Sequence, residues 1–323
     1  MCAALTRSFY GRRHELRRNT PEVRLSGVFP AAITPHRPGT WEADFGAALE
    51  LMDFLANGGA DGICLLGSTG EFLHFDFEQR RRLVHLCRKR CRVPLIVNVT
   101  HSTLAGALQL ADDALASGAD ALMVAPPYYF RYAAEEVEEF YRVFARETGR
   151  QTPLFLYHIP QFTSGIALAT VRRLVREGLY QGIKDSSCDW ANFLGLLELK
   201  KECSLAVFSG SEVDSARALR AGADGLILAN ACALPEIVCG MAQAIRSGDE
   251  AAADRHYATL LEFNAWIARF PAPVGVKRAM ELRGQISGSP AVPLAPATQL
   301  LMDEFSSWFG PWISTATGAG KIG

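Results

Sequence analysis

The chain has 323 residues, of which 49% are hydrophobic, and its formal net charge is −1. This composition is typical of a globular chain with ample apolar material for a core. The near-neutral charge gives no electrostatic footprint for nucleic acid, and we find neither an apolar run long enough to cross a membrane nor a secretory signal.

The eight cysteines are scattered along the sequence. Cys87 and Cys91 stand four residues apart on an expected helix, but no histidine or second cysteine pair completes a metal site. We therefore expect no metal ion. We interpret the cysteines as buried thiols of a reducing compartment, which predicts a cytoplasmic location.

Residues 1–24 are rich in arginine and have no apolar period. A segment of this kind can be an organellar transit peptide. We favour a flexible or subunit-contacting extension, because Glu15, Pro21 and Glu22 interrupt the amphipathic pattern.

From Val28 onwards, short apolar runs alternate with longer stretches of helical period. We expect strands near residues 26–33, 62–66, 94–99, 120–124, 153–157, 180–184, 205–209 and 225–229. We expect the accompanying helices near residues 42–57, 75–91, 103–117, 133–148, 167–177, 189–202, 211–221 and 234–247. Parallel strands joined through such helices predict a (β/α)8 TIM barrel over residues 25–248. An open, doubly wound sheet is the alternative, but no G-x-G-x-x-G follows the first strand.

The helical pattern continues after the barrel, near residues 249–269, 274–284 and 295–308. These segments predict a C-terminal helical extension of the same domain over residues 249–309. Residues 310–323 are expected to form a tail, and the chain is expected to be loosely ordered from about Ser306.

Lys184 ends an apolar run of strand type, L-Y-Q-G-I-K, and polar residues beginning with Asp185 follow it. The C-terminal ends of barrel strands meet at one mouth, so polar residues there are candidates for chemistry. Loss of hydration is expected to lower the pKa of Lys184 and to leave part of it as a nucleophilic amine, which a Schiff-base catalyst requires. The alternative is a structural lysine paired with Asp185.

Gly67–Glu71 reads G-S-T-G-E after the second expected strand. Two hydroxyl groups and the N–H groups of a tight turn suit a carboxylate, although a flexible loop is the alternative. Tyr157 ends the fifth expected strand, where it can pass protons to and from the intermediates of imine formation on Lys184. Strand alternation sends His158 to the opposite side, so we expect it to serve structure.

Five motifs in this order resemble the dihydrodipicolinate synthase / N-acetylneuraminate lyase family of pyruvate-dependent Schiff-base aldolases. They are G-V-F-P-A-A-I-T-P, G-S-T-G-E-F, P-P-Y-Y, L-Y-H-I-P and G-I-K-D-S-S, and the match runs from about Ser26 to the C-terminal helices. The resemblance implies a metal-independent carbon–carbon lyase whose substrate is a small keto acid. It implies no cofactor beyond the covalent imine with pyruvate or a 2-keto acid.

The resemblance also implies the roles of individual residues. Lys184 would form the imine with the keto carbon of the substrate. Ser68 and Thr69, in the turn that begins at Gly67, would hold the carboxylate. Tyr157 would be the proton shuttle, with Thr69 as part of a relay to it.

Other implied roles depend on neighbouring loops and subunits. Tyr129 would complete the relay by reaching into the neighbouring subunit of a tight dimer, and the family habit is a homotetramer built as a dimer of such dimers. Gly210 and the backbone carbonyl of Ile227 would flank the imine. Asp185 and Ser186 favour a hydroxylated substrate, as in the sugar-acid aldolases of the family.

The sequence departs from the synthases of this family at one informative position. They carry an arginine five residues after the strand-end tyrosine, and Phe162 stands there in this chain. No planar fork is available at that position for a second carboxylate. This difference argues against synthesis of dihydrodipicolinate.

We therefore expect an enzyme that cleaves or forms a 2-keto acid of the sugar-acid type, to or from pyruvate and an aldehyde. A dihydrodipicolinate synthase and a keto-deoxy sugar acid dehydratase are alternatives that use the same imine. A non-catalytic ligand-binding barrel would be expected to lack Lys184 or Tyr157, and both are present. A metal-dependent barrel enzyme requires clustered His, Asp and Glu at strand ends, which the sequence does not offer.

Overall fold

The computed structural model describes residues 25–149 and 152–317. The predicted N-terminal extension and the last residues of the predicted tail lie outside the described residues. Eight parallel strands form one sheet, in the order β1-β8-β7-β6-β5-β4-β3-β2. They are β1 (Gly27–Pro30), β2 (Ile63–Leu65), β3 (Leu95–Asn98), β4 (Ala121–Val124), β5 (Leu154–His158), β6 (Gly182–Asp185), β7 (Ala206–Ser209) and β8 (Gly225–Leu228).

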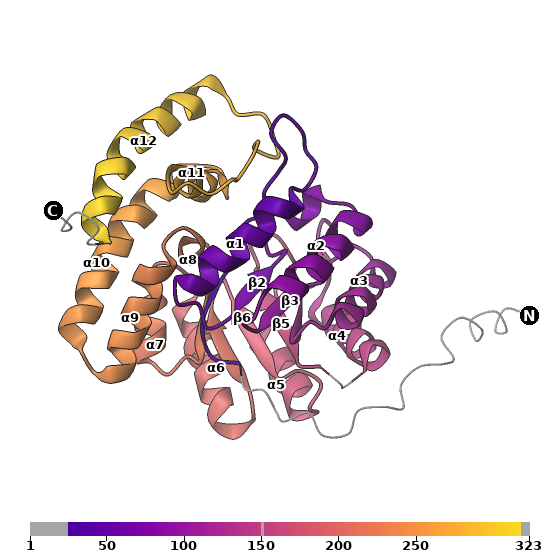
Figure 1. The fold of residues 1–323 in the computed structure, drawn as a ribbon. Helices are drawn as coiled ribbons and strands as arrows, with labels where there is room; N and C mark the ends of the chain where they lie inside the picture. Colours follow the sequence, from indigo (N-terminus) through magenta and orange to yellow (C-terminus); the bar gives the residue numbers. More distant parts are fainter. Residues whose placement is uncertain (1–24, 150–151, 318–323) are drawn as a thin grey trace, which may run out of the picture.

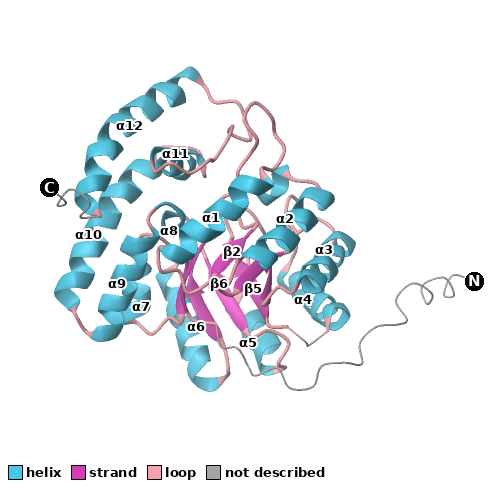
Figure 2. Ribbon diagram, viewed as in Figure 1, coloured by secondary structure: helices cyan, strands magenta, loops and turns pink. Residues whose placement is uncertain are grey.

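The sheet closes on itself between its first two strands. Ala31 and Cys64 form a parallel bridge there, and the amide of Ala32 donates to the carbonyl oxygen of Cys64 at 3.0 Å. Figure 2 shows the strands gathered at the centre with helices around them. The fold is therefore the predicted (β/α)8 barrel, and the open doubly wound sheet is excluded.

The helices that follow the strands in sequence lie around the barrel (Figure 1). They are α1 (Phe45–Asn57), the short 3-10 helix η1 (Phe72–His74), α2 (Phe77–Arg90), α3 (Leu104–Ser117), α4 (Ala134–Thr148), α5 (Leu168–Arg176), α6 (Trp190–Glu202), α7 (Ser215–Arg220), α8 (Asn230–Ala233) and α9 (Pro235–Ser247). Asp44, Asp76, Thr103 and Asp189 cap the N-termini of α1, α2, α3 and α6 with their side chains. The sequence did not predict α8, and it placed the start of α7 four residues before Ser215.

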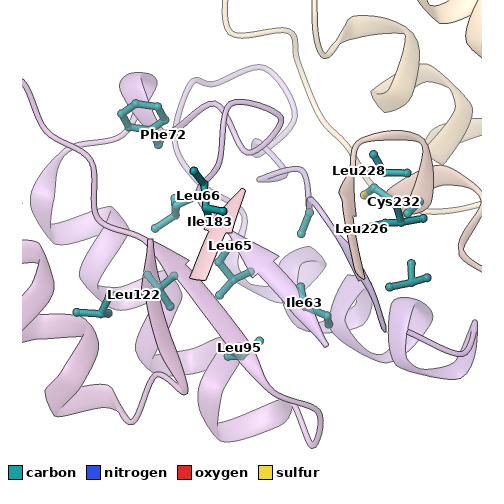
Figure 3. Packing of buried hydrophobic residues seen from close by; sticks show 14 of the residues in the cluster. Ile63, Leu65, Leu66, Phe72, Leu95, Leu122, Ile183, Leu226, Leu228 and Cys232 are labelled. Atoms are coloured by element: carbon teal, nitrogen blue, oxygen red, sulfur yellow. The ribbon is translucent and has the colours of Figure 1, made fainter. Parts of the chain in front are cut away.

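Alternate strand residues face two separate apolar layers, because successive side chains of a strand point to opposite faces. The outer layer lies between strands and helices, and Figure 3 shows part of it, including Ile63, Leu65, Leu122 and Leu226. The inner layer fills the barrel with side chains of the other phase, such as Phe29, Ile96, Met123, Phe155 and Phe208. The inner layer also includes Tyr157, which is 2% exposed.

Glycine at the start of β6 makes room for a large inner side chain. A Cβ at Gly182 would lie 2.2 Å from the ring of Phe155, which stands beside it on β5. The same ring packs edge-on against Phe208 of β7, with 5.8 Å between centroids. This packing fills the barrel beneath the next inward residue of β6, which is Lys184.

Three helices follow the barrel in the described residues: α10 (Glu250–Ile267), α11 (Val274–Leu282) and α12 (Pro296–Ala316). Figure 1 shows them together on one side of the barrel, with α12 beside α10 and α11. The prediction of loose order from Ser306 is wrong as far as Ala316, because α12 continues through Pro311. Phe305, Phe309 and Trp312 of α12 contact Phe263 of α10, so aromatic packing holds the helix together beyond its expected end.

None of the helices in residues 25–149 and 152–317 is long and apolar enough to span a bilayer.

Candidate active site

Tyr157 and Lys184 lie side by side at the C-terminal ends of adjacent strands. The parallel register of β5 and β6 pairs them directly. The Nζ atom of Lys184 lies 3.4 Å from the phenolic oxygen of Tyr157 and 4.5 Å from the centroid of its ring. Lys184 is 5% exposed, so its amine is shielded from bulk water at the mouth of the barrel.

Asp185 does not pair with the lysine. Its Oδ1 accepts from the amide of Ser187 at 2.8 Å and its Oδ2 accepts from the side chain of Asn192 at 3.0 Å. Because Asp185 has the opposite strand phase, its carboxylate faces α6 rather than the barrel. The observed contacts therefore do not support the alternative of a structural Lys184–Asp185 pair.

The direction predicted for the pKa of Lys184 is wrong. Burial is the largest influence and lowers the pKa, but attraction to Tyr157, Cys64 and Glu212 outweighs it, so the pKa lies above its ordinary value. The sequence showed the burial but not the partners, which come from β5, β2 and the segment after β7. Lys184 accordingly rests as an ammonium ion and must pass its proton to a neighbour before it can act as a nucleophile.

Ser68 extends the contact between the lysine and the tyrosine. Its Oγ lies 3.1 Å from the phenolic oxygen of Tyr157. The three side chains therefore form a chain of Lys184, Tyr157 and Ser68. The sequence assigned the hydroxyl of this relay to Thr69, whereas the structure places Ser68 against the tyrosine; Thr69 is half-buried in the same turn.

The turn from Leu66 to Glu71 leaves polar groups available. Within the described residues, the amide N–H groups of Ser68 and Thr69 donate to no acceptor. The turn is closed by a bond from the amide of Glu71 to the carbonyl oxygen of Ser68 at 3.0 Å. Gly67 has open space around the position of a Cβ, so its role is not to prevent a clash. Two unpaired N–H groups beside two hydroxyls have the chemistry of an anion cradle.

Gly210 is required sterically beside Lys184. A Cβ there would lie 2.8 Å from Cε of Lys184 and 2.1 Å from Oγ of Ser186. The structure therefore brings Gly210 and Ser186 next to the lysine. Ile227 is buried in the inner layer of the barrel, on β8.

Tyr129 is the predicted site residue that lies apart from the others in this chain. It is 88% exposed and has a φ of +80°, which is rare for a residue with a side chain. Its ring contacts Phe130, with 5.0 Å between centroids. Tyr128 instead packs edge-on against Phe72, at 6.1 Å between centroids.

His158 is the last residue of β5, and Phe162 lies in the loop that follows this strand. His158 is buried, and its Nδ1 accepts from the amide of Ile166 at 3.0 Å, which fixes the loop after β5. Burial lowers the pKa of His158, against the opposing influence of Asp185 and Asp189. Phe162 is 66% exposed, so its ring is available at the surface rather than buried in the core.

Sequence reasoning missed the supports of the turn. Asn98 of β3 donates to the carbonyl oxygen of Leu66 at 2.7 Å, and Lys277 of α11 forms an ion pair with Glu71 at 2.5 Å. The sequence predicts a helix near residues 274–284 and assigns no role to Lys277 within it. Its burial could be suspected from the apolar residues on both sides, Val276 and Ala279, but its partner could not.

Among the described residues, no group of three or more His, Cys, Asp or Glu side chains is arranged to hold a metal ion. At the mouth of the barrel, the buried amine of Lys184 contacts the phenol of Tyr157, which in turn lies beside the hydroxyl of Ser68. A buried amine next to a proton carrier at this place in a (β/α)8 barrel is typical of the class of enzymes that work through a covalent imine.

The family comparison agrees with this class. The model of the dihydrodipicolinate synthetase family matches residues 24–308, so the chain belongs to that family. It is accordingly a lyase of the Schiff-base type, with relatives that act as aldolases or synthases.

Curated relatives of both kinds are similar to the chain. A protein of Escherichia coli K12 named "Probable 2-dehydro-3-deoxy-D-pentonate aldolase" is 32% identical over 75% of this chain and 81% of its own length. A 4-hydroxy-tetrahydrodipicolinate synthase of Phenylobacterium zucineum is 30% identical over 84% of this chain and 92% of its own length. The two relatives thus share the family but not the named reaction.

Solved structures agree with the fold. A prophage protein of Escherichia coli K12 in complex with pyruvate, described as belonging to the dihydrodipicolinic acid synthase family, superposes with a TM-score of 0.82. It covers 89% of this chain and 98% of its own, at 24% identity. At that identity the likeness establishes the barrel alone.

Proposed function

We propose that this enzyme cleaves or forms a 2-keto acid of the sugar-acid type, to or from pyruvate and an aldehyde, through an imine on Lys184. The observation that carries the proposal is the chain formed by the buried side chains of Lys184 and Tyr157 and the exposed Ser68, with distances of 3.4 Å and 3.1 Å between successive polar atoms. A reactive amine in contact with a proton carrier is what imine formation requires.

The first half of the reaction forms the imine. Tyr157 takes the proton of the Lys184 ammonium ion, and Ser68 carries it onward. The neutral amine adds to the keto carbon of the substrate, and the carbinolamine then loses water to give a protonated imine. Tyr157 lies within reach of Nζ and can return a proton to the departing hydroxyl group.

The second half breaks the bond between the third and fourth carbons of the substrate. A base removes the proton of the hydroxyl on the fourth carbon, and the aldehyde leaves as the bonding electrons move to the third carbon. The protonated imine accepts those electrons and becomes an enamine. Protonation at the third carbon and hydrolysis of the imine release pyruvate and restore Lys184, and the reverse sequence forms the bond.

The substrate carboxylate is assigned to the turn that begins at Gly67. The unpaired N–H groups of Ser68 and Thr69 support this assignment, together with the hydroxyl of Thr69. Gly210, Ser186 and the carbonyl of Ile227 are proposed to flank the imine. The close approach of Gly210 to Lys184 and Ser186 supports the first two of these roles.

The sugar-acid type of substrate is favoured over the dicarboxylate of a synthase. Phe162 stands where the synthases carry an arginine, and its exposed ring offers no charge to a second carboxylate. The aldolase named among the relatives acts on a 2-dehydro-3-deoxy-pentonate by its name. Dihydrodipicolinate synthesis and dehydration of a keto-deoxy sugar acid remain the alternatives, and product analysis separates the three.

We propose further that the enzyme is a cytoplasmic homo-oligomer, a dimer of tight dimers, in which Tyr129 of one subunit completes the relay of its neighbour. The exposure and strained backbone of Tyr129 support a contact outside its own chain. The free thiols of the described residues support a reducing compartment.

The test of the imine is incubation with pyruvate and sodium borohydride, followed by mass mapping of the modified peptide. We expect one reduced adduct on Lys184, its loss in a folded Lys184→Ala variant and no change in Lys201→Ala, whose side chain is 70% exposed. A folded wild-type protein that gives no adduct with pyruvate or with any 2-keto acid contradicts the proposal.

A further inference from the structure

The turn that holds Ser68 and Thr69 has an unusual backbone at both ends. Leu66 has a φ of +58° and Glu71 a φ of +51°, and neither residue is glycine. The left-handed region is unfavourable for residues with a Cβ, so surrounding contacts must hold such a conformation. Those contacts determine where the N–H groups of the turn point.

Glu71 is held by a residue that lies far away in the sequence. Its carboxylate forms an ion pair with Nζ of Lys277 at 2.5 Å, and the two side chains are 8% and 5% exposed. Lys277 belongs to α11, which comes after the whole barrel. Burial lowers the pKa of Lys277, and attraction to Glu71 opposes this effect.

Lys277 is itself held in place from the other side. Its Nζ lies 3.0 Å from Nδ1 of His36, which in turn lies 2.8 Å from the carbonyl oxygen of Ser289. The ring of His36 stacks on Phe75, with 5.0 Å between centroids. Burial lowers the pKa of His36, and the charge of Lys277 lowers it further. A neutral imidazole therefore contacts the ammonium group, and Glu71 provides the opposite charge.

Two further bonds complete the support. Thr34, which follows β1, donates from Oγ1 to the carbonyl oxygen of Gly70 at 2.8 Å. Asn98 holds the carbonyl oxygen of Leu66 at the other end of the turn. Both bonds involve the backbone of the turn, whereas the ion pair is its only charged support among the described residues.

We propose that Glu71 and Lys277 are a positioning pair for the keto acid: the C-terminal extension, through Lys277, holds the turn in the conformation that presents the N–H groups of Ser68 and Thr69 to the substrate carboxylate. The inference rests on the proposed function, because it takes that turn as the carboxylate site. It makes the helices after the barrel part of the substrate-binding apparatus.

The test replaces both charges at once, as Glu71→Met with Lys277→Met. Removing one partner would leave the other charge buried and unpaired, which destabilises the fold for reasons unrelated to substrate. The readout is the pyruvate concentration that gives half-maximal borohydride trapping, together with KM and kcat for cleavage. The matched control is Arg283→Met with Glu236→Met, since that pair also joins the α11 end to the barrel, at 2.6 Å, but does not contact the turn.

We expect the Glu71/Lys277 double variant to raise the half-saturating pyruvate concentration about tenfold or more, with the larger part of the loss in KM. Loss of binding common to ground and transition states appears mainly in KM. The control pair should lower thermal stability and leave the half-saturating concentration unchanged. If the two methionines prevent folding, Glu71→Gln with Lys277→Met removes the same ion pair with less change of shape and decides the question.

An unchanged half-saturating concentration in a folded double variant would overturn the inference while leaving the proposed function intact. An equal rise in the control pair would also overturn it, because the effect would then come from general loosening of α11. Absence of a wild-type adduct would overturn both the inference and the proposed function.

Discussion

Lys184 contacts Tyr157 in two ways at once. Its Nζ lies 3.4 Å from the phenolic oxygen and 4.5 Å from the centroid of the same ring. Both the oxygen and the face of the ring attract a cation. The contact therefore stabilises the ammonium form of Lys184 at rest, and it also supplies the group that can accept the proton when substrate arrives.

Replacing Tyr157 with phenylalanine separates these two effects. Loss of the proton carrier should lower the turnover rate by about 100-fold or more, the usual scale of general acid–base catalysis. Loss of its attraction should lower the pKa of Lys184, since Tyr157 is one of the influences that raise that pKa. The neutral amine then predominates from a lower pH, so the rising limb of the pH profile of pyruvate trapping should move to lower pH. Measuring the turnover rate and the pH profile of pyruvate trapping on one preparation tests the relay.

An unchanged turnover rate in the folded Tyr157→Phe variant would assign the proton transfer to another group. A limb that moves to higher pH would show that the tyrosine does not stabilise the ammonium form.

Ser68 and Thr69 are expected to differ in their effects although they are adjacent. Ser68→Ala removes the hydroxyl 3.1 Å from Tyr157 and should lower kcat. Thr69→Val keeps the shape of the side chain and the backbone N–H, and should mainly raise KM for the keto acid. Steady-state kinetics of the two variants provide the measurement, after thermal unfolding has shown that the variants are equally stable. A larger loss of kcat in Thr69→Val would return the relay to Thr69.

The difference between these two residues illustrates what the sequence could predict. The motif G-S-T-G-E placed both hydroxyls at the barrel mouth. The choice between them depends on the turn from Leu66 to Glu71, whose backbone has positive φ at residues that are not glycine. The residue types in the turn do not reveal such a conformation, because contacts from distant segments of the chain impose it.

Barrel architecture was predictable for the opposite reason. The alternation of apolar runs and helical periods is local. It placed Tyr157 and Lys184 at strand ends that meet at the barrel mouth, and strand alternation put His158 on the opposite side from Tyr157. The pKa of Lys184 and the burial of Lys277 depend on partners from several strands and helices. Long-range pairs such as Glu71 and Lys277, separated in sequence by six strands of the barrel, could not be inferred from local pattern.

Dilution should abolish activity if Tyr129 acts across a subunit boundary. The tyrosine is 88% exposed in the isolated chain, so a dissociated subunit would lack that member of the relay. Activity measured alongside molecular mass over a dilution series checks this, with Tyr132→Ala as a control on the same loop. Full activity per subunit in a monomer would exclude the shared relay.

Glu138 should make the contact between α4 and α5 sensitive to acid. Its carboxylate accepts from Nε of Arg173 at 2.8 Å and from the side chains of Arg142 and Thr170 at 2.8 Å and 3.2 Å. The hydrogen bond from Arg173 is the main cause that lowers its pKa to about 2. A lowered carboxyl pKa contributes stability that is fully present above the ordinary pKa of about 4.5 and is lost as pH falls toward about 2.

Glu138→Gln should therefore destabilise the protein by about 1 kcal/mol at pH 7, a value reduced by solvent screening of the arginines. The difference from wild type should shrink between about pH 4.5 and pH 2, the interval over which the carboxyl group of the unfolded chain takes up a proton while the native carboxylate stays ionised. Denaturant unfolding at several pH values measures it. Glu139→Gln is the matched control, because Glu139 lies 3.8 Å from Arg146 with both side chains 64% exposed, and it should have little effect at any pH. A Glu138→Gln difference as large at pH 2.5 as at pH 7 would show that shape, rather than charge, determines the contact.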